Sequence, residues 1–277
     1  MIFLRAETRK NGLWSQRSNV AQNENSCWVV DLGRIAYGPA CEFQRRLVEA
    51  RKARVLPDVL LFCEHPHVIT LGRNGKREHL RASGHVLEQM KVEFLPTDRG
   101  GDITYHGPGQ IVGYPILDLT EHHRDVRWYA SQLEEMMIRT TGDFGIAAKR
   151  LEDMRGVWME APTGPEKIGA LGVHLSRWVT SHGFAYNVST DLRFFDLIVP
   201  CGIADKRVTS LEKAIGHAVG CDQVRPLLAA HFGYLFDRVM MSVSRRQLEE
   251  ALANHDASVT MIPAEPSRAA TGGEGNA

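Results

Sequence analysis

The sequence predicts an α/β protein of the α+β type, in which helices flank a mixed sheet. Segments rich in β-branched and aromatic residues, separated by Gly and Pro, cluster in the middle of the chain. Segments with helical periodicity lie toward both ends of the body, at residues 38–56 and 222–240. Strands that cluster between helices indicate a sheet covered by helices.

The first elements alternate between strand and helix. The segment 27–33, CWVVDLG, has the composition of a buried strand, and the helix 38–56 follows with Pro39 near its first turn. The apolar segment 58–65, DVLLFCEH, predicts a return as a strand.

The middle of the chain predicts mostly strands, and its last part predicts helices. The strand candidates are 92–98, 102–106, 110–119, 155–160, 167–175 and 180–188. The helix candidates are 126–145, which a glycine closes, 209–216 and 222–240.

Composition suggests one enzyme-sized domain between two tails. The sequence predicts a flexible extension over 1–26, a catalytic domain over 27–262 and a disordered tail over 263–277. The chain has 33 basic and 33 acidic side chains, so no net field attracts it to nucleic acid or an anionic membrane.

Cysteine usage and hydropathy predict a cytoplasmic protein. The five cysteines are odd in number and form no CxxC pair, which argues against a secreted disulfide framework. The N-terminal apolar run is too short for a signal peptide, and no stretch reaches the ~18 apolar residues of a membrane span.

A glycine-rich loop, DRGGDITYHGPGQ at 98–110, is a candidate binding site. Its glycines permit close approach of main-chain N–H groups to a ligand carbonyl, phosphate or thioester. Thr104, Tyr105 and His106 add a hydroxyl, a phenol and an imidazole, and we expect His106 to form hydrogen bonds in the pocket. The alternative is a pair of glycine turns around a hairpin strand. The pattern is not that of a phosphate loop.

Two further residues could carry chemistry. Cys201, in LIVPCGI, follows an apolar strand and precedes a glycine, where a thiol can be reactive, although a buried cysteine is often only a small apolar residue. Lys167 begins the strand KIGALGVHL, a position that is also typical of a solvated strand end. If Lys167 packed against Cys201, its ammonium would favour the thiolate.

Histidine spacing offers a metal site as an alternative. Cys63, His65 and His67 alternate and could share one face of a strand, but Pro66 interrupts it and no fourth ligand is identifiable. We therefore expect no metal.

Taken together, the motifs resemble the lipoyl(octanoyl) transferase family. The shared pattern combines RGGxxTYHGPGQ, KI, HGFAxN and IxPCGI, in an order that extends from about Val30 to Arg238. The chain departs from the pattern at His67, where a second proline is expected after the sequence EH.

The resemblance implies a fold similar to the catalytic domain of biotin and lipoate ligases, and a function. The enzyme would transfer an octanoyl group from octanoyl-acyl carrier protein to a lysine of lipoyl domains, the first step of endogenous lipoylation. Its acceptors would be the lipoyl domains of 2-oxoacid dehydrogenases and the glycine cleavage H protein. No cofactor is implied.

The resemblance also assigns site residues. Cys201 would accept the acyl group, and Lys167 would lower the thiol pKa and exchange protons. The walls of the acyl pocket would be Arg99, Gly100, Gly101, Asp102, Ile103, Thr104, Tyr105, His106, Ala170, Leu171, Gly172, Gly183, Phe184 and Ala185.

Three other functions compete with this one. An ATP-dependent lipoate or biotin ligase would need no cysteine, and the chain lacks the glycine triplet and HDxGN of such ligases. A non-catalytic protein that binds acyl carriers or lipoyl domains would not need both Lys167 and Cys201. A cysteine hydrolase would require a Cys and His pair with an orienting Asn, and none stands out.

Overall fold

The computed structural model describes residues 25–199 and 207–260, with side chains up to residue 254. Nearly all of the predicted extension 1–26 and all of the predicted tail 263–277 lie outside these residues, as does Cys201. Within the described part of the chain, no helix is both long and apolar enough to cross a membrane.

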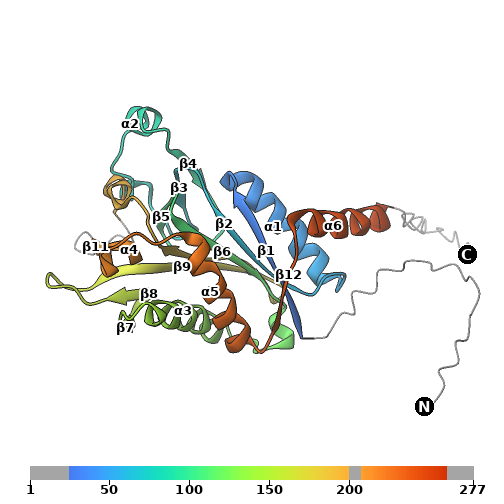
Figure 1. Ribbon diagram of the computed structural model, residues 1–277. Coiled ribbons are helices and arrows are strands. Elements are labelled where there is room, and N and C mark those ends of the chain that lie inside the picture. The colour runs from blue at the N-terminus through green and yellow to red at the C-terminus, as the bar shows by residue number, and fades with distance from the viewer. Residues whose placement is uncertain (1–24, 200–206, 261–277) are drawn as a thin grey trace, which may run out of the picture.

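A large mixed sheet forms the centre of the molecule (Figure 1). Its strands are, in spatial order, β12 (Val239–Ser242), β1 (Ser26–Arg34), β2 (Asp58–Glu64), β6 (Gln110–Ile116), β10 (Val179–Asn187), β9 (Glu166–Ser176), β8 (Met154–Met159) and β7 (Lys149–Leu151). The pairs at the β12 end are parallel and those from β2 to β7 are antiparallel. The predicted mixed sheet is confirmed.

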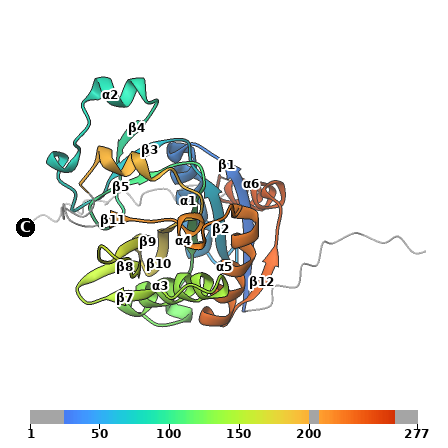
Figure 2. The ribbon, with the colours of Figure 1, turned by 60° about the vertical axis from the view of Figure 1, so that its left-hand side comes forward.

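A two-residue strand extends the large sheet, and a separate small sheet lies beside it. The strand β11 (Arg207–Val208) pairs in parallel with the start of β9. A small sheet consists of β4 (Glu93–Pro96), β3 (Val68–Leu71) and β5 (Ile103–His106), and it lies beside β9 and β11 in Figure 2. The short helix α2 (Gly84–Gln89) extends this part of the molecule outward (Figure 2).

Helices cover both faces of the large sheet. The helices α1 (Tyr37–Lys52) and α6 (Arg245–Thr260) pack on one face, and α3 (Val126–Asp143) and α5 (Cys221–Phe236) pack on the other (Figure 1). The short α4 (Leu211–Ile215) follows β11. Short 3-10 helices at Arg77–His79, Leu119–Glu121 and Leu192–Leu197 complete the elements of the described residues.

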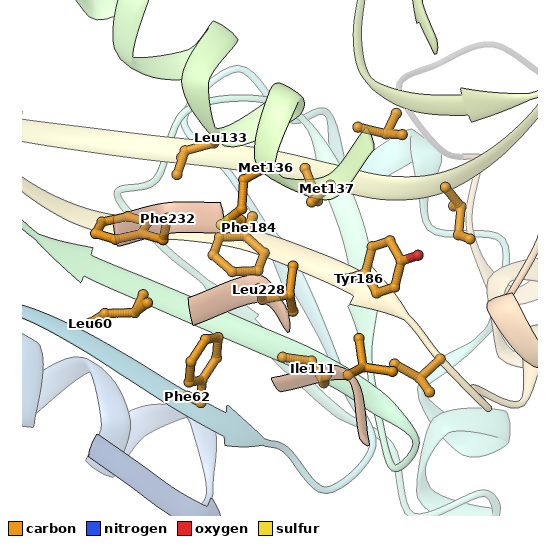
Figure 3. Packing of buried hydrophobic residues seen from close by; sticks show 14 of the residues in the cluster. Leu60, Phe62, Ile111, Leu133, Met136, Met137, Phe184, Tyr186, Leu228 and Phe232 are labelled. Atoms are coloured by element: carbon orange, nitrogen blue, oxygen red, sulfur yellow. The ribbon is translucent and has the colours of Figure 1, made fainter. Parts of the chain in front are cut away.

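The period of the strands divides the core between these two faces. On β2, Leu60 and Phe62 face α3 and α5, whereas Val59 and Leu61 face α1 and α6. Figure 3 shows the first set, in which the rings of Phe62 and Phe184 approach Leu228. Both sets are almost wholly buried, and each fully buried large side chain of this kind stabilises the fold by about 1.5–3 kcal/mol.

Several predicted boundaries were wrong. The helix predicted over 222–240 ends at Phe236, because Asp237 takes a left-handed conformation with φ of 50°, and β12 follows it. The helix predicted over 38–56 ends at Lys52. The strands β3, β7, β11 and β12 and the helices α2 and α6 had not been predicted as separate elements.

Candidate active site

One cavity of about 590 Å³ lies between the large sheet and the loop before β5. Its walls include Lys167 and thirteen of the fourteen predicted wall residues. These are Arg99, Gly100, Gly101, Asp102, Ile103, Thr104, His106, Ala170, Leu171, Gly172, Gly183, Phe184 and Ala185. Of the described residues that the sequence assigned to the site, Tyr105 alone is not part of the wall.

Glycines let the two layers meet at main-chain distance. The Gly100 N–H donates to the Val173 carbonyl at 2.9 Å, which joins the loop to β9. A Cβ atom on Gly172 would lie 2.7 Å from the Gly100 oxygen, closer than a real Cβ can approach. The cavity wall here is therefore built from peptide groups.

Arg99 ties the loop to the small sheet. Its guanidinium donates to the Thr70 carbonyl at 2.7 Å, to the Thr70 hydroxyl and to the Gly100 carbonyl, and the residue is 7% exposed. These bonds orient the loop that borders the cavity.

Lys167 lies near the start of β9, opposite two other strands. Its ammonium nitrogen is 4.5 Å from the ring centroid of Trp158 on β8, at a directly paired position. On the other side, Val208 of β11 pairs with Lys167, and the Thr209 N–H donates to the Lys167 carbonyl at 2.9 Å. In the sequence, five residues lie between Cys201 and Arg207, the first residue of β11.

A chain of hydrogen bonds fixes the protonation of His106. The Thr209 carbonyl can only accept, so it receives the Asn187 amide N–H at 2.9 Å. The Asn187 oxygen then accepts from Gln110 Nε2 at 2.9 Å, and this nitrogen also donates to the Tyr105 carbonyl. The Gln110 oxygen therefore faces His106 Nδ1 at 2.7 Å, and Nδ1 must carry the proton.

Burial keeps His106 neutral. Desolvation is the largest cause, and together with the nearby His65 and Arg99 it lowers the pKa of His106 to about 3. With its proton on Nδ1, the ring has an unprotonated Nε2 at neutral pH. His106 can thus act as a hydrogen-bond acceptor in the cavity wall.

Tyr105 points to the opposite side of β5. Its phenol bonds with His67 Nδ1 at 2.7 Å, and its ring stacks on Phe194 with centroids 5.1 Å apart. Successive residues of a strand face opposite ways, so Thr104 and His106 line the cavity while Tyr105 supports the small sheet from behind.

His182 is a cavity residue that the sequence analysis missed. Its ring Nε2 hydrogen-bonds with the Asp98 carboxylate at 2.7 Å, and its main-chain N–H donates to the Gln44 side-chain oxygen at 2.8 Å. Burial lowers the pKa of His182, and Asp98 partly opposes this effect. The signal was present in HGFAxN, the motif that also contains Asn187.

The residues considered for a metal site, Cys63, His65 and His67, lie in two unrelated places. His65 Nδ1 hydrogen-bonds with the Ile35 carbonyl at 2.6 Å. Its Nε2 hydrogen-bonds with the Tyr114 hydroxyl at 2.7 Å and lies 3.6 Å from the Cys63 sulfur. His67 instead packs on Phe194 with centroids 4.1 Å apart. Over residues 25–199 and 207–260, no group of three or more His, Cys, Asp or Glu side chains could hold a metal ion.

The four described cysteines are in environments that oppose ionisation. Burial raises the pKa of Cys27 and Cys63 well above the usual thiol value. It also raises the pKa of Cys41 to about 11 and that of Cys221 to about 12. None of the four lines the cavity.

Solved structures define the class of fold. A bipartite lipoate protein ligase from Thermoplasma acidophilum superposes with a TM-score of 0.63 at 17% identity, over 83% of this chain and 91% of that one. A lipoate-protein ligase A bound with ATP superposes with a TM-score of 0.60 at 15% identity, over 83% and 93%. The fold is that of the lipoate protein ligases.

Sequence similarity then identifies the family. The family model of the lipoyl protein ligase A/B catalytic domain matches residues 36–233, and the chain belongs to this family. An octanoyltransferase from Solibacter usitatus is 53% identical over 78% of this chain and 96% of its own length. One from Koribacter versatilis is 48% identical over 75% and 83%. These relatives confirm the predicted family and the predicted enzyme class of octanoyltransferase.

Proposed function

We propose that the protein transfers an octanoyl group from octanoyl-acyl carrier protein to the lysine ε-amine of lipoyl domains. The observation that carries the proposal is the place of Lys167. Its side chain lines an apolar, glycine-walled cavity, next to the strand that follows the Cys201 segment in sequence. The octanoyltransferase relatives and the lipoate ligase fold support the choice of acyl group and acceptor.

The proposed reaction has two steps. The Cys201 thiolate attacks the thioester carbonyl of the donor, and the bond to the carrier sulfur breaks. The carrier thiolate takes a proton, which Lys167 can supply. The lysine ε-amine of the acceptor then attacks the Cys201 thioester and gives a proton back to Lys167 as the C–S bond breaks. The products are an amide, a free carrier thiol and the regenerated thiolate.

A nearby cation is useful in this scheme because a free thiol has a pKa of ~8.5 and is mostly protonated at neutral pH. The Lys167 ammonium would favour the thiolate. Main-chain N–H groups of the cavity wall are suited to stabilise the oxyanion of each step, which is worth ~3 kcal/mol per donor in known enzymes. A thioester is already activated, so the scheme requires no ATP.

Intact-mass analysis tests the proposal. Mixing the protein with octanoyl carrier protein should add one octanoyl group, and adding an apo lipoyl domain should move that group to the domain without ATP. Cys201→Ser should abolish the adduct, and Lys167→Ala should slow transfer while the fold is retained. The control is Cys41→Ser, which changes a half-buried cysteine outside the cavity wall and should leave transfer unchanged.

Two outcomes would refute the scheme. An undiminished octanoyl adduct on Cys201→Ser would exclude this nucleophile. An absolute requirement for ATP would instead indicate a ligase, the activity named for a solved structure of the same fold.

A further inference from the structure

We propose that Trp158 and Glu134 are positioning residues that hold the Lys167 ammonium in the wall of its cavity. The proposal rests on the proposed function, since it assumes that Lys167 exchanges protons during transfer. It concerns two side chains that carry no reacting atom and that no motif of the sequence identified.

Trp158 provides the surface on which the ammonium rests. The ring is 2% exposed, lines the cavity, and has its centroid 4.5 Å from Lys167 Nζ. The indole N–H donates to the Met154 carbonyl at 3.3 Å, which fixes the ring within its own strand. A cation over an aromatic face is attracted by the ring quadrupole, and more strongly where water is displaced.

An irregularity in the pairing of β8 with β9 lies directly beside the two side chains. Trp158 pairs with Lys167, but the next pair joins Val157 to Gly169, so β9 contains one residue more than β8 at this point. Residues directly opposite on antiparallel strands project from the same face, so the ammonium and the ring meet. A regular ladder would carry one register through both pairs.

Glu134 anchors the same irregularity from helix α3. Its carboxylate accepts the Gly156 N–H at 2.9 Å, and its side chain is 2% exposed. Arg150 and Arg155 lie 3.3 and 3.5 Å from its second oxygen. A buried carboxylate with such partners is held in one place.

Gly156 links the anchor to the lysine. Its φ is 114°, and a Cβ there would lie 2.6 Å from the Gly169 carbonyl oxygen and 3.2 Å from Lys167 Cε. The lysine stem therefore passes directly over this glycine. The anchor, the glycine and the ring together define where the ammonium can lie.

Paired substitutions at Trp158 test the ring. Trp158→Leu keeps an apolar side chain but removes the aromatic face, and should slow acyl-enzyme formation roughly tenfold. It should also move the alkylation profile of Cys201 to higher pH, because a displaced ammonium stabilises the thiolate less. Trp158→Phe retains a ring and should stay close to the wild type in both measurements. A leucine variant with the wild-type profile, or a phenylalanine variant as slow as leucine, would overturn the proposal.

A nuclear magnetic resonance measurement reports the geometry without any reaction. In protein labelled with ¹³C-lysine, the ring current of Trp158 should shift the Lys167 ε-methylene signal upfield, and Lys167→Arg identifies that signal. The shift should be lost in Trp158→Leu. A signal at the random-coil position in the wild type would refute the contact.

Neighbouring glutamates provide a matched test of the anchor. Glu134→Leu should displace the Lys167 signal and raise the pH at which Cys201 is alkylated, whereas Glu134→Gln keeps an acceptor oxygen and should restore most of both. Glu135→Leu is the control, because Glu135 pairs with Arg139 and Arg150 and not with Gly156. Equal effects of Glu134→Leu and Glu135→Leu would contradict a specific anchor.

Failure of this proposal is distinguishable from failure of the proposed function. If Cys201→Ser and Lys167→Ala abolish or slow transfer but Trp158→Leu does not, only the positioning role is wrong. If Cys201→Ser and Lys167→Ala leave transfer intact, the proposed function is wrong and the lysine signal still tests the contact.

Discussion

Two backbone carbonyls, those of Thr209 and Tyr105, decide which nitrogen of His106 carries the proton. Thr209 fixes Asn187, Asn187 and the Tyr105 carbonyl fix Gln110, and Gln110 fixes the ring. Each amide is buried and cannot reverse without placing two acceptors face to face. The chain also connects β5, β6 and β10 with the residue that follows β11.

The low pKa of His106 predicts a dependence of stability on pH. The folded pKa of about 3 lies below the unfolded value of ~6.5, so the unfolded chain binds the proton first as the pH falls. The contribution of His106 is complete above pH ~6.5 and declines by up to ~1.4 kcal/mol per pH unit toward pH 3.

Denaturant unfolding between pH 7 and 4 checks this expectation. His106→Gln should make the free energy of unfolding fall less steeply than in the wild type. The control is His85→Gln, at an exposed position, which should leave the wild-type slope. Parallel slopes for the wild type and His106→Gln would contradict a buried neutral imidazole.

At the scale of elements, the irregular pairing of β8 with β9 depends on one glycine. Gly156 and Gly164 both have positive φ, 114° and 105°, but only Gly156 is crowded. A Cβ on Gly156 meets the Gly169 carbonyl oxygen, whereas one on Gly164 meets no atom within 4 Å.

The two alanine variants therefore separate backbone strain from collision. In both variants the alanine must adopt a left-handed conformation, which destabilises the fold. Gly156→Ala should lose a further ~1–3 kcal/mol of unfolding free energy because the strands must move apart. Thermal and denaturant unfolding of the pair measures the difference. Equal losses would show that β8 and β9 relax without cost.

Elements were predictable where local pattern and tertiary structure agree. The glycine-rich loop and the strands β5, β6, β9 and β10 were expected near their observed positions. Gly and Pro separate the β-rich segments of β5 and β6. The strand β12 was not expected, because Val239 continues the helical period and only the left-handed Asp237 interrupts it.

The partnership of Trp158 with Lys167 could not be read from the sequence either. Nine positions separate the two residues, and a regular hairpin permits several registers for them. The observed register joins Trp158 to Lys167 and shifts by one residue at Val157, next to the glycine whose N–H Glu134 of α3 accepts. Contacts of this kind arise only after the helix packs on the sheet.

At the scale of the whole molecule, Asp58 joins both ends of the described chain. Its carboxylate, at the start of β2, accepts from Arg51 of α1 at 2.9 Å and from Arg238, before β12, at 2.8 Å. It also bonds with His122 at 3.1 Å. Despite strong desolvation, these partners lower the pKa of Asp58 to about 2.

Removing this buried charge should destabilise the whole fold. Asp58→Asn removes the buried carboxylate that Arg51 and Arg238 share, leaves them only the partly exposed Glu121, and should cost ~3–5 kcal/mol of unfolding free energy. Asp191→Asn, which breaks an exposed pair with Arg193, should cost ~0–1 kcal/mol. Urea unfolding at pH 7 measures both, and a small loss at Asp58 would contradict its central place.

Asp58 also makes the free energy of unfolding depend on pH. Since its folded pKa is depressed, its stabilisation is present above the unfolded value of ~3.9 and disappears as the pH falls toward 2. The wild type should therefore lose more stability than Asp58→Asn between pH 4 and 2, as acid titration of the folded fraction would show.

Where Gly100 meets Gly172, the cavity wall has no side chain that a substitution could shorten. A Cβ added to Gly172 would collide with the Gly100 oxygen and push the two layers apart, and no substitution at this place can widen the cavity. We therefore expect laboratory evolution toward shorter or longer acyl chains to find its solutions elsewhere along the wall.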